Sequence, residues 1–405
     1  MHPDGMRSLA RFRPSAVLLL PLLCSLAMAQ DVSDGVAIPC VSPKARVAEA
    51  STSSQDSEKT KETQTSASTK KRGNFVIAPI PVTSPALGSG VIPVVGYIFS
   101  LSRNDTTSPP SVVGAAGLIT DNGSRAFAVA GQFFIKEDTY HASAAFFQGN
   151  LNYHLYGIGI TAGDAEAKLP LKQEGTVFLG EFQRRLHGRF FIGPRVIAGD
   201  SIITVREGGS ATAPVPPDTG LSTRLTAAGI IVNRDTRPNR FYPTSGTLFN
   251  FTADFFAHAF GSKYSFQSYR VEFNKYGSLS PKQVLAYNAF FCATGGEPPF
   301  YGNCIYGTRN ELRGYEAGRY LDRYMVATQL EYRLVLPKRF GAVAFGGIGG
   351  IGPGGRELFR SSALLPAGGA GLRFMLSKSH HVNLRADLAV GKNEHTFSLG
   401  ISEAF

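Results

Sequence analysis

A strict alternation of apolar and polar residues restricts what this chain can fold into. In the last segment, HTFSLGISEAF, an apolar face made by Phe397, Leu399, Ile401 and Phe405 opposes a face of serine, threonine and glycine. The same period of two recurs from about residue 75 onward, and no helical period interrupts it. With 45 glycines, 29 phenylalanines and no tryptophan, the composition also suits many short strands joined by turns. The pattern predicts an all-β fold.

Alternation alone does not distinguish a soluble sandwich from a membrane barrel, because both have one apolar face. Three features favour the barrel. The pattern continues to the end of the chain, the strands have about 9 to 13 residues, which suits a tilted bilayer crossing, and the chain begins with an export signal. We therefore expect a single transmembrane antiparallel β-barrel in the bacterial outer membrane.

The export signal is predicted over residues 1–29. Three arginines precede the apolar run 17–26, and Ala27-Met28-Ala29 forms a small-x-small cleavage site. The apolar run is too short to cross a bilayer as a helix, which needs about 20 residues. A lipoprotein interpretation of Cys24 is disfavoured, because Leu23 stands where a small residue is expected.

Two further regions follow the signal. Residues 30–73 include STSSQDSEKTKETQTSASTKKR, a polar stretch without aromatic residues that cannot bury enough apolar surface to fold. It is predicted to be a disordered linker, with the barrel over 74–405. Sixteen strands are expected, an even number as in bacterial barrels, near residues 91–102, 111–119, 125–136, 139–147, 151–160, 175–186, 189–203, 222–233, 246–256, 264–279, 282–293, 323–336, 340–350, 364–376, 381–391 and 395–405.

Loop lengths orient this barrel in the membrane. With periplasmic termini, alternate connections should be short internal turns, among them 121–123 and 148–150, whereas the others are longer external loops. The longest external loop, 294–322, contains the charged stretch TRNELRGYEAGRYLD.

The cysteines and histidines limit the chemistry of the chain. In an oxidising compartment Cys292 and Cys304 could pair and close a small loop, worth about 2–4 kcal/mol, and Cys40 is left over. Histidines and cysteines lack the spacing of a metal site, so no cofactor is expected. No histidine lies near a nucleophile motif, which argues against an enzyme.

The net charge of +11 favours anionic partners. Lysine and arginine do not alternate with aromatic residues, and an exported chain rarely meets nucleic acid, so none is expected. Phosphates of outer-membrane lipids are the expected counter-charge, although a basic balance is also typical of a solvated surface.

Two motifs occur in order in the second half of the chain. NRDTRPNRFYPTSG precedes a predicted strand, and Arg313-Gly314-Tyr315 lies in the longest loop, with five strands following to Phe405. Together they resemble the bacterial surface antigen family, the carboxy-terminal barrels of BamA-like outer-membrane assembly factors and two-partner secretion transporters. The residues that match the periplasmic turn motif of that family are Asp235, Arg237, Tyr242, Pro243, Thr244 and Gly246. That stretch also reads as an ordinary tight turn, because proline fixes φ and glycine accepts positive φ.

The resemblance implies that the loop folds back into the lumen as a latch. Arg313 would bind Glu331 on the twelfth predicted strand, which the alternation aims inward. The family also has an aspartate on the next strand. Here Gly347 stands in its place, so the arginine is expected to have one acceptor fewer.

The resemblance also concerns the seam between the first and last strands. Phe405 resembles the sorting signal by which the barrel assembly machinery recognises outer-membrane barrels during biogenesis. Pro93 would weaken the first predicted strand, as a lateral gate requires, or it simply precedes that strand.

The implied function is insertion or translocation of proteins at the outer membrane. The periplasmic client-binding modules of the family have no counterpart in residues 30–73, so a periplasmic partner protein would have to supply them. The alternative is a passive pore or a structural surface barrel without client proteins.

Overall fold

The computed structural model describes residues 73–405, except 85–86, 103, 106, 166–167, 208–218, 309–310, 361–362 and 378–380. The predicted signal peptide, Cys40 and the rest of the linker before Gly73 lie outside the described residues. No helix in the described ranges is long and apolar enough to cross a membrane.

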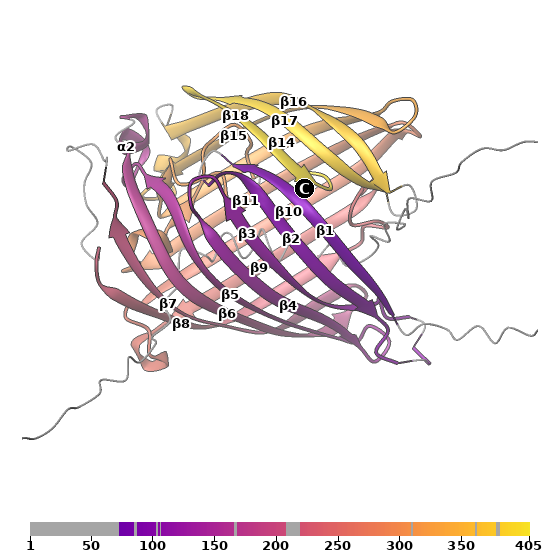
Figure 1. Cartoon of the computed structure of the whole chain (residues 1–405), viewed down its shortest axis with the longest axis horizontal. Helices are drawn as coiled ribbons and strands as arrows, with labels where there is room; N and C mark the ends of the chain where they lie inside the picture. Colours follow the sequence, from indigo (N-terminus) through magenta and orange to yellow (C-terminus); the bar gives the residue numbers. More distant parts are fainter. Residues whose placement is uncertain are drawn as a thin grey trace, which may run out of the picture.

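Sixteen antiparallel strands close into one barrel, in which each strand pairs with its chain neighbours and β1 meets β18. Figure 1 shows the tilted strands running round the wall from β1 in indigo to β18 in yellow. The predicted fold class and strand number are confirmed. The barrel strands are β1 (Gly73–Ser84), β2 (Gly88–Phe99), β3 (Ser111–Thr120), β4 (Arg125–Ile135), β5 (Tyr140–Leu155), β6 (Leu169–His187), β7 (Phe190–Val205), β8 (Ser222–Asp235), β9 (Gly246–Phe256), β10 (Phe266–Ser280), β11 (Gln283–Gly296), β14 (Tyr324–Val335), β15 (Phe340–Gly352), β16 (Leu364–Ser377), β17 (Val382–Gly391) and β18 (Glu394–Ile401).

The connections between the barrel strands contain short helices and one small sheet. The segment between β11 and β14 contains the 3-10 helix η3 (Phe300–Gly302) and a two-stranded sheet of β12 (Cys304–Ile305) and β13 (Leu321–Asp322). Helix α2 (Ile160–Asp164) follows β5, and the 3-10 helices η2 (His258–Phe260) and η4 (Glu357–Phe359) follow β9 and β15. We call the end of the barrel that carries α2, η2 and η4 the loop end, and the opposite end the turn end.

Two errors in the strand prediction cancel in the total. The first strand is β1, which contains Pro79 and Pro81 and was not predicted as a strand, and it begins one residue before the predicted barrel boundary. The predicted strands 139–147 and 151–160 are instead one long strand, β5, because QGN at 148–150 stays extended and pairs with β6. Residues 148–150 are therefore not a turn.

The shift also reverses the predicted direction of the first strands. The turn at 121–123 was expected at the periplasmic end, but Asn122 donates a hydrogen bond to the carbonyl of Asn152 at 2.8 Å. Asn152 lies near the end of β5 that leads to α2. This turn therefore belongs to the loop end.

The alternation separates two surfaces, as the sequence indicates. Apolar side chains such as Phe127, Phe178 and Leu330 lie on the outside with 43–47% of their surface exposed. Their neighbours in sequence face inward and are buried or half-buried. An apolar belt around a closed barrel matches a lipid environment.

Candidate functional site: the lumenal loop and the seam

The segment between β11 and β14 folds into the barrel instead of extending from it. Tyr306, Leu312 and Tyr320 have no exposed surface, and they pack with Met325 and Ile351 of the wall. A disulfide between Cys292 of β11 and Cys304 of β12 ties the start of the segment to the wall, with 5.9 Å between the Cα atoms. We call residues 297–323 the lumenal loop.

Arg313 is held on several sides within the lumen. Its Nη2 donates to Glu331 Oε2 at 2.5 Å, its Nη1 to Asp387 Oδ2 at 2.9 Å and its Nε to Gln329 Oε1 at 3.1 Å. The guanidinium lies 3.4 Å from the ring centroid of Phe345. Only 5% of Arg313 is exposed. Such a buried cation requires paired, hydrogen-bonded acceptors, and removing one is costly.

The expectation that Gly347 leaves the arginine one acceptor short is wrong. Asp387 of β17 supplies the second carboxylate. A Cβ at Gly347 would lie 2.3 Å from the carbonyl oxygen of Thr328 and 2.8 Å from Cδ1 of Leu312. The wall and the lumenal loop therefore exclude a side chain at position 347 of β15. The second carboxylate, Asp387, lies on β17 instead.

The arginine belongs to a larger charged network that sequence reasoning did not identify. Arg373 donates to Asp387 at 2.6 Å and to Glu403 at 2.8 Å, and Arg333 donates to Glu331 at 2.6 Å. We call this set the lumenal network: Arg313, Arg333, Arg373, Arg385, Glu331, Asp387 and Glu403. Arg385 and Asp387 lie in the predicted strand 381–391, but their partners on other strands follow only from the register between strands.

The rest of the Arg-Gly-Tyr motif also binds the wall. The hydroxyl of Tyr315 donates to the carbonyl of Pro366 at 2.6 Å and accepts from the backbone nitrogen of Lys392 at 3.0 Å. Burial raises the pKa of Tyr315 to about 12, so the donating proton is retained. Gly314 has φ of 112°, and a Cβ there would lie 3.1 Å from the backbone of Val390. Both the conformation and the close approach require glycine.

A second set of contacts holds the lumenal loop at the loop end. The hydroxyl of Tyr320 donates to Asp164 at 2.9 Å, and Lys392 donates to the other oxygen of Asp164 at 2.7 Å. Arg319 Nη1 lies 3.4 Å from Glu394 Oε2 of β18. Thus α2, the lumenal loop and the β17–β18 turn are joined across the mouth of the barrel.

Glu316 is part of the same region. Tyr156 donates to it at 2.7 Å, and His154 and Lys168 lie within 3.9 Å. Burial alone would raise the pKa of Glu316, but nearby His154, the hydrogen bond from Tyr156 and the charge of Lys168 outweigh burial. The pKa therefore lies below its ordinary value.

Among the described residues, β1 and β18 pair at one register position, Thr83 opposite Leu399, whereas β1 and β2 pair along their whole length. Pro79 of β1 faces Pro93 of β2. Neither has an N–H, so they form a non-hydrogen-bonded pair, and the backbone groups of residue 79 point toward β18. By the period of two, Pro81 points the same way. From Thr83 toward the turn end, the next two residues of β1 that face β18 are therefore Pro81 and Pro79. Neither has a backbone N–H to donate to β18.

The sequence analysis attributed a weak seam to Pro93. In the structure, the prolines that face the seam are Pro79 and Pro81. Pro93 lies in β2, where the ladder to β3 is interrupted between Val91 and Val94. Edge strands commonly carry prolines because these prevent further pairing.

The last residues leave the sheet. β18 ends at Ile401, and Ser402 has φ of 66°, which turns the chain inward. Glu403 accepts hydrogen bonds from Arg373 and Asn383, and the backbone oxygen of Phe405 accepts from Arg333 at 2.8 Å. The prediction that residues 395–405 form one strand with Phe405 on its apolar face is therefore wrong.

The predicted periplasmic turn contacts the same network. Asp235 accepts two side-chain hydrogen bonds from Arg237, at 3.0 and 2.9 Å, and the carbonyl of Pro243 accepts from Arg333 at 3.3 Å. Gly246 has φ of 92°, and a Cβ would lie 2.6 Å from the carbonyl oxygen of Thr236. The remaining motif residues lie beside these: Tyr242 stacks near His381, and the carbonyl of Thr244 accepts from Ser278.

The closed sixteen-strand barrel with an apolar outer belt defines this protein as an outer-membrane β-barrel. Residues 209–405 match the model of the Omp85 superfamily domain. The match covers the part of the barrel from β8 to the end of the chain, so this part is similar to the Omp85 superfamily domain.

Solved structures share this fold. BamA from Haemophilus ducreyi lacking POTRA domains 1–3 aligns with a TM-score of 0.54 and 14% identity, over 82% of this chain and 71% of that one. CdiB from Acinetobacter baumannii aligns with 0.53 and 11% identity, over 82% and 60%, and CdiB from Escherichia coli with 0.54 and 9%, over 82% and 67%. No curated protein sequence matches the chain.

Proposed function

We propose that this barrel inserts or translocates polypeptides at the outer membrane, with the lumenal loop as a latch and the β1–β18 seam as the part that opens. The observation that carries the proposal is the contrast at the seam. In the part of the chain that the structure describes, one register position joins β1 and β18, while the lumenal loop and the lumenal network bind the strands beside them.

The latch would act through the strands nearest the seam. Arg313 joins β14 to β17, Tyr315 joins the loop to β16 and the β17–β18 turn, and Glu403 joins the chain end to β16 and β17. These contacts fix β16 to β18 as one unit against the loop. Because breaking a buried charged pair costs about 3–5 kcal/mol, the unit would stay closed until a client or partner compensates for that cost.

The partners of this activity follow from the same proposal. Outer-membrane lipids surround the barrel, and the barrel assembly machinery would read the end of the last strand, including Phe405, before the chain end turns inward. Client chains would be presented by a periplasmic partner protein that bears client-binding modules. A pulldown from the periplasm with the barrel as bait tests this part.

A lock across the seam tests the function itself. Thr83→Cys with Leu399→Cys, in a Cys40→Ser background, places two cysteines at the paired position. Cross-linking should stop assembly of client outer-membrane proteins or export of client chains in cells that depend on this barrel, whereas each single cysteine variant should remain active. Normal client handling with a quantitatively cross-linked seam would contradict the proposal.

A passive pore is the competing function. In the described residues, buried side chains of the lumenal loop fill the region beside β11, β14 and β15, and this argues against a steady aqueous channel. In planar bilayers a latch predicts infrequent, variable openings, whereas a pore predicts steady ohmic conductance.

A further inference from the structure

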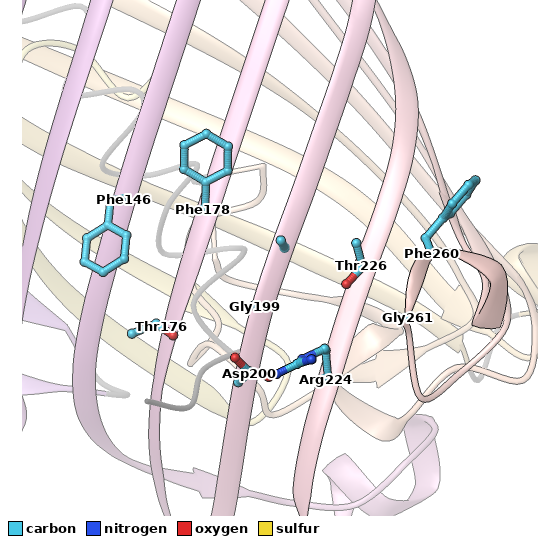
Figure 2. A pocket seen from close by; sticks show the side chains of 10 residues that line it. Phe146, Thr176, Phe178, Gly199, Asp200, Arg224, Thr226, Phe260 and Gly261 are labelled. Atoms are coloured by element: carbon cyan, nitrogen blue, oxygen red, sulfur yellow. The ribbon is translucent and has the colours of Figure 1, made fainter. Parts of the chain in front are cut away.

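A groove of about 380 Å³ lies on the outer surface of β5 to β8 at the loop end. Figure 2 shows Phe146 and Phe178 on neighbouring strands at one side, and Phe260 of η2 at the other. These rings are 38–49% exposed, which identifies the groove as part of the outer face and not of the lumen.

The register divides the groove into two rungs of different chemistry. Phe146, Phe178, Ala198 and Thr226 lie opposite one another across four strands and form a mostly apolar rung. The next outward rung toward the loop end is polar and contains Gln148, Thr176, Asp200 and Arg224. The boundary between the apolar belt and the polar rim of the barrel therefore crosses this groove.

Mostly small outward residues continue from the groove toward the turn end. The following rung consists of Ala144, Gly180, Val196 and Ala228, and beyond it Phe182 and Ile230 are exposed. At about 3.3 Å per residue, the distance from the polar rung to Ile230 is roughly 20 Å. An outward surface of that length, made of small and aliphatic side chains beside exposed aromatic rings, can take an extended acyl chain.

The polar rung carries one charge of each sign. Arg224 Nε donates to Asp200 Oδ1 at 2.8 Å, and the side chain of Arg224 is 67% exposed. Arginine has five N–H donors, and among the described residues the pair uses only Nε and Oδ1. The two Nη groups can donate to a phosphate, and Oδ2 can accept from an ammonium group.

We propose that this groove binds a phospholipid with a zwitterionic phosphoethanolamine headgroup. The phosphate lies on Arg224, the ammonium group on Asp200, and one acyl chain on Ala198 and the small residues below it. A purely anionic headgroup fits less well, because Asp200 would repel it.

Native mass spectrometry of the purified full chain tests the proposal, with phosphatidylethanolamine, phosphatidylglycerol and phosphatidylcholine of identical chains as probes. Phosphatidylethanolamine should be retained most strongly. Arg224→Gln should weaken its retention about tenfold, the loss of one charged hydrogen-bonding group. Ala198→Phe places a large side chain in the groove and should weaken the retention of all three lipids.

Lys172→Gln is the matched control. Lys172 forms an outward ion pair with Glu174 on β6 at 2.7 Å, near the same end of the barrel but outside the groove lining. It should leave retention unchanged. Equal retention of the three lipids, stronger retention of phosphatidylglycerol, or an equal loss in Lys172→Gln would each overturn the proposal. Heat-modifiable gel mobility shows whether each variant is folded.

Discussion

The two halves of the barrel wall bury very different side chains. Between β5 and β8 the inward side chains are largely apolar, and Phe147, Leu171 and Ile197 are at most 1% exposed. Between β14 and β17 the inward side chains include the charges of the lumenal network, and Glu331, Arg333 and Asp387 are equally buried. The first half is held mainly by non-directional packing, beside the buried ion pairs of Arg195 with Glu181 and Asp254, and it cannot open without loss of apolar burial. The second half is held by directional pairs that a competing charge can replace.

This comparison predicts that substitutions in the two halves can cost the same stability and still differ in how often the barrel opens. Phe147→Ala should lower the free energy of unfolding by about 3–5 kcal/mol through a cavity, without changing conductance. Arg313→Ala should cost a similar amount, about 3–5 kcal/mol, because it leaves buried carboxylates short of a partner, and it should increase channel openings. Urea titration in lipid vesicles and planar-bilayer recording measure the two effects. Equal conductance in both variants would refute the division into two halves.

Gly347 offers a sharper probe of the charged half. Gly347→Ala places a methyl group against the carbonyl of Thr328 and against Leu312, and should cost about 1–3 kcal/mol by overpacking. Its neighbour Gly346 is the control, since a Cβ there meets only the carbonyl of Ala367 at 3.9 Å. Thermal unfolding followed by gel mobility should separate the two variants. A neutral Gly347→Ala would mean that Leu312 can move freely.

The prolines of β1 allow the opposite change. Pro79→Ala and Pro81→Ala restore two donors that face β18, and each should stabilise the seam by about 0.5–1.5 kcal/mol if the strand ends pair. Openings in planar bilayers should become rarer. Pro93→Ala, on the far side of β2, is the control and should not change them.

Acid should also destabilise the lumenal loop, with a smaller effect on opening than the substitutions above. The pKa of Glu316 is lowered in the folded protein, so its contribution is present above the ordinary glutamate pKa and is lost as the pH falls through the folded value. As the pH falls below the ordinary glutamate pKa of 4.5, openings should become more frequent. Glu316→Gln should open more often at neutral pH and lose this part of the pH dependence. Acid-induced opening that is unchanged in Glu316→Gln would assign the effect to another group.

The period of two was sufficient to predict the wall, because each residue on a strand has its face set by parity. It located β14 to β17 closely and aimed Glu331 into the lumen. It failed where a local signal contradicted the global fold. The prediction gave no strand to residues 74–84, where Pro79 and Pro81 lie. A strand beside a weakly paired neighbour tolerates prolines, because it makes little use of the N–H groups on that side.

The charged site was only half predictable. Arg313 and Glu331 were identified from a motif and from parity, but Asp387 lies 74 residues from Arg313 in sequence, and only the closed barrel brings them together. The inward turn of the chain end depends on Ser402 at positive φ, which serine rarely adopts. The chain end turns inward because Arg373 and Arg333 donate hydrogen bonds to Glu403 and to the backbone oxygen of Phe405. The alternation along one strand cannot predict these contacts.

The central claim is that the lumenal network keeps the seam closed. Planar-bilayer recording of Arg313→Ala, with and without a cross-link between Thr83→Cys and Leu399→Cys, tests it most directly. The variant should open frequently, and the cross-link should return it to the quiet state of the unmodified protein. Openings that persist through a complete cross-link would show that current passes elsewhere and would contradict the claim.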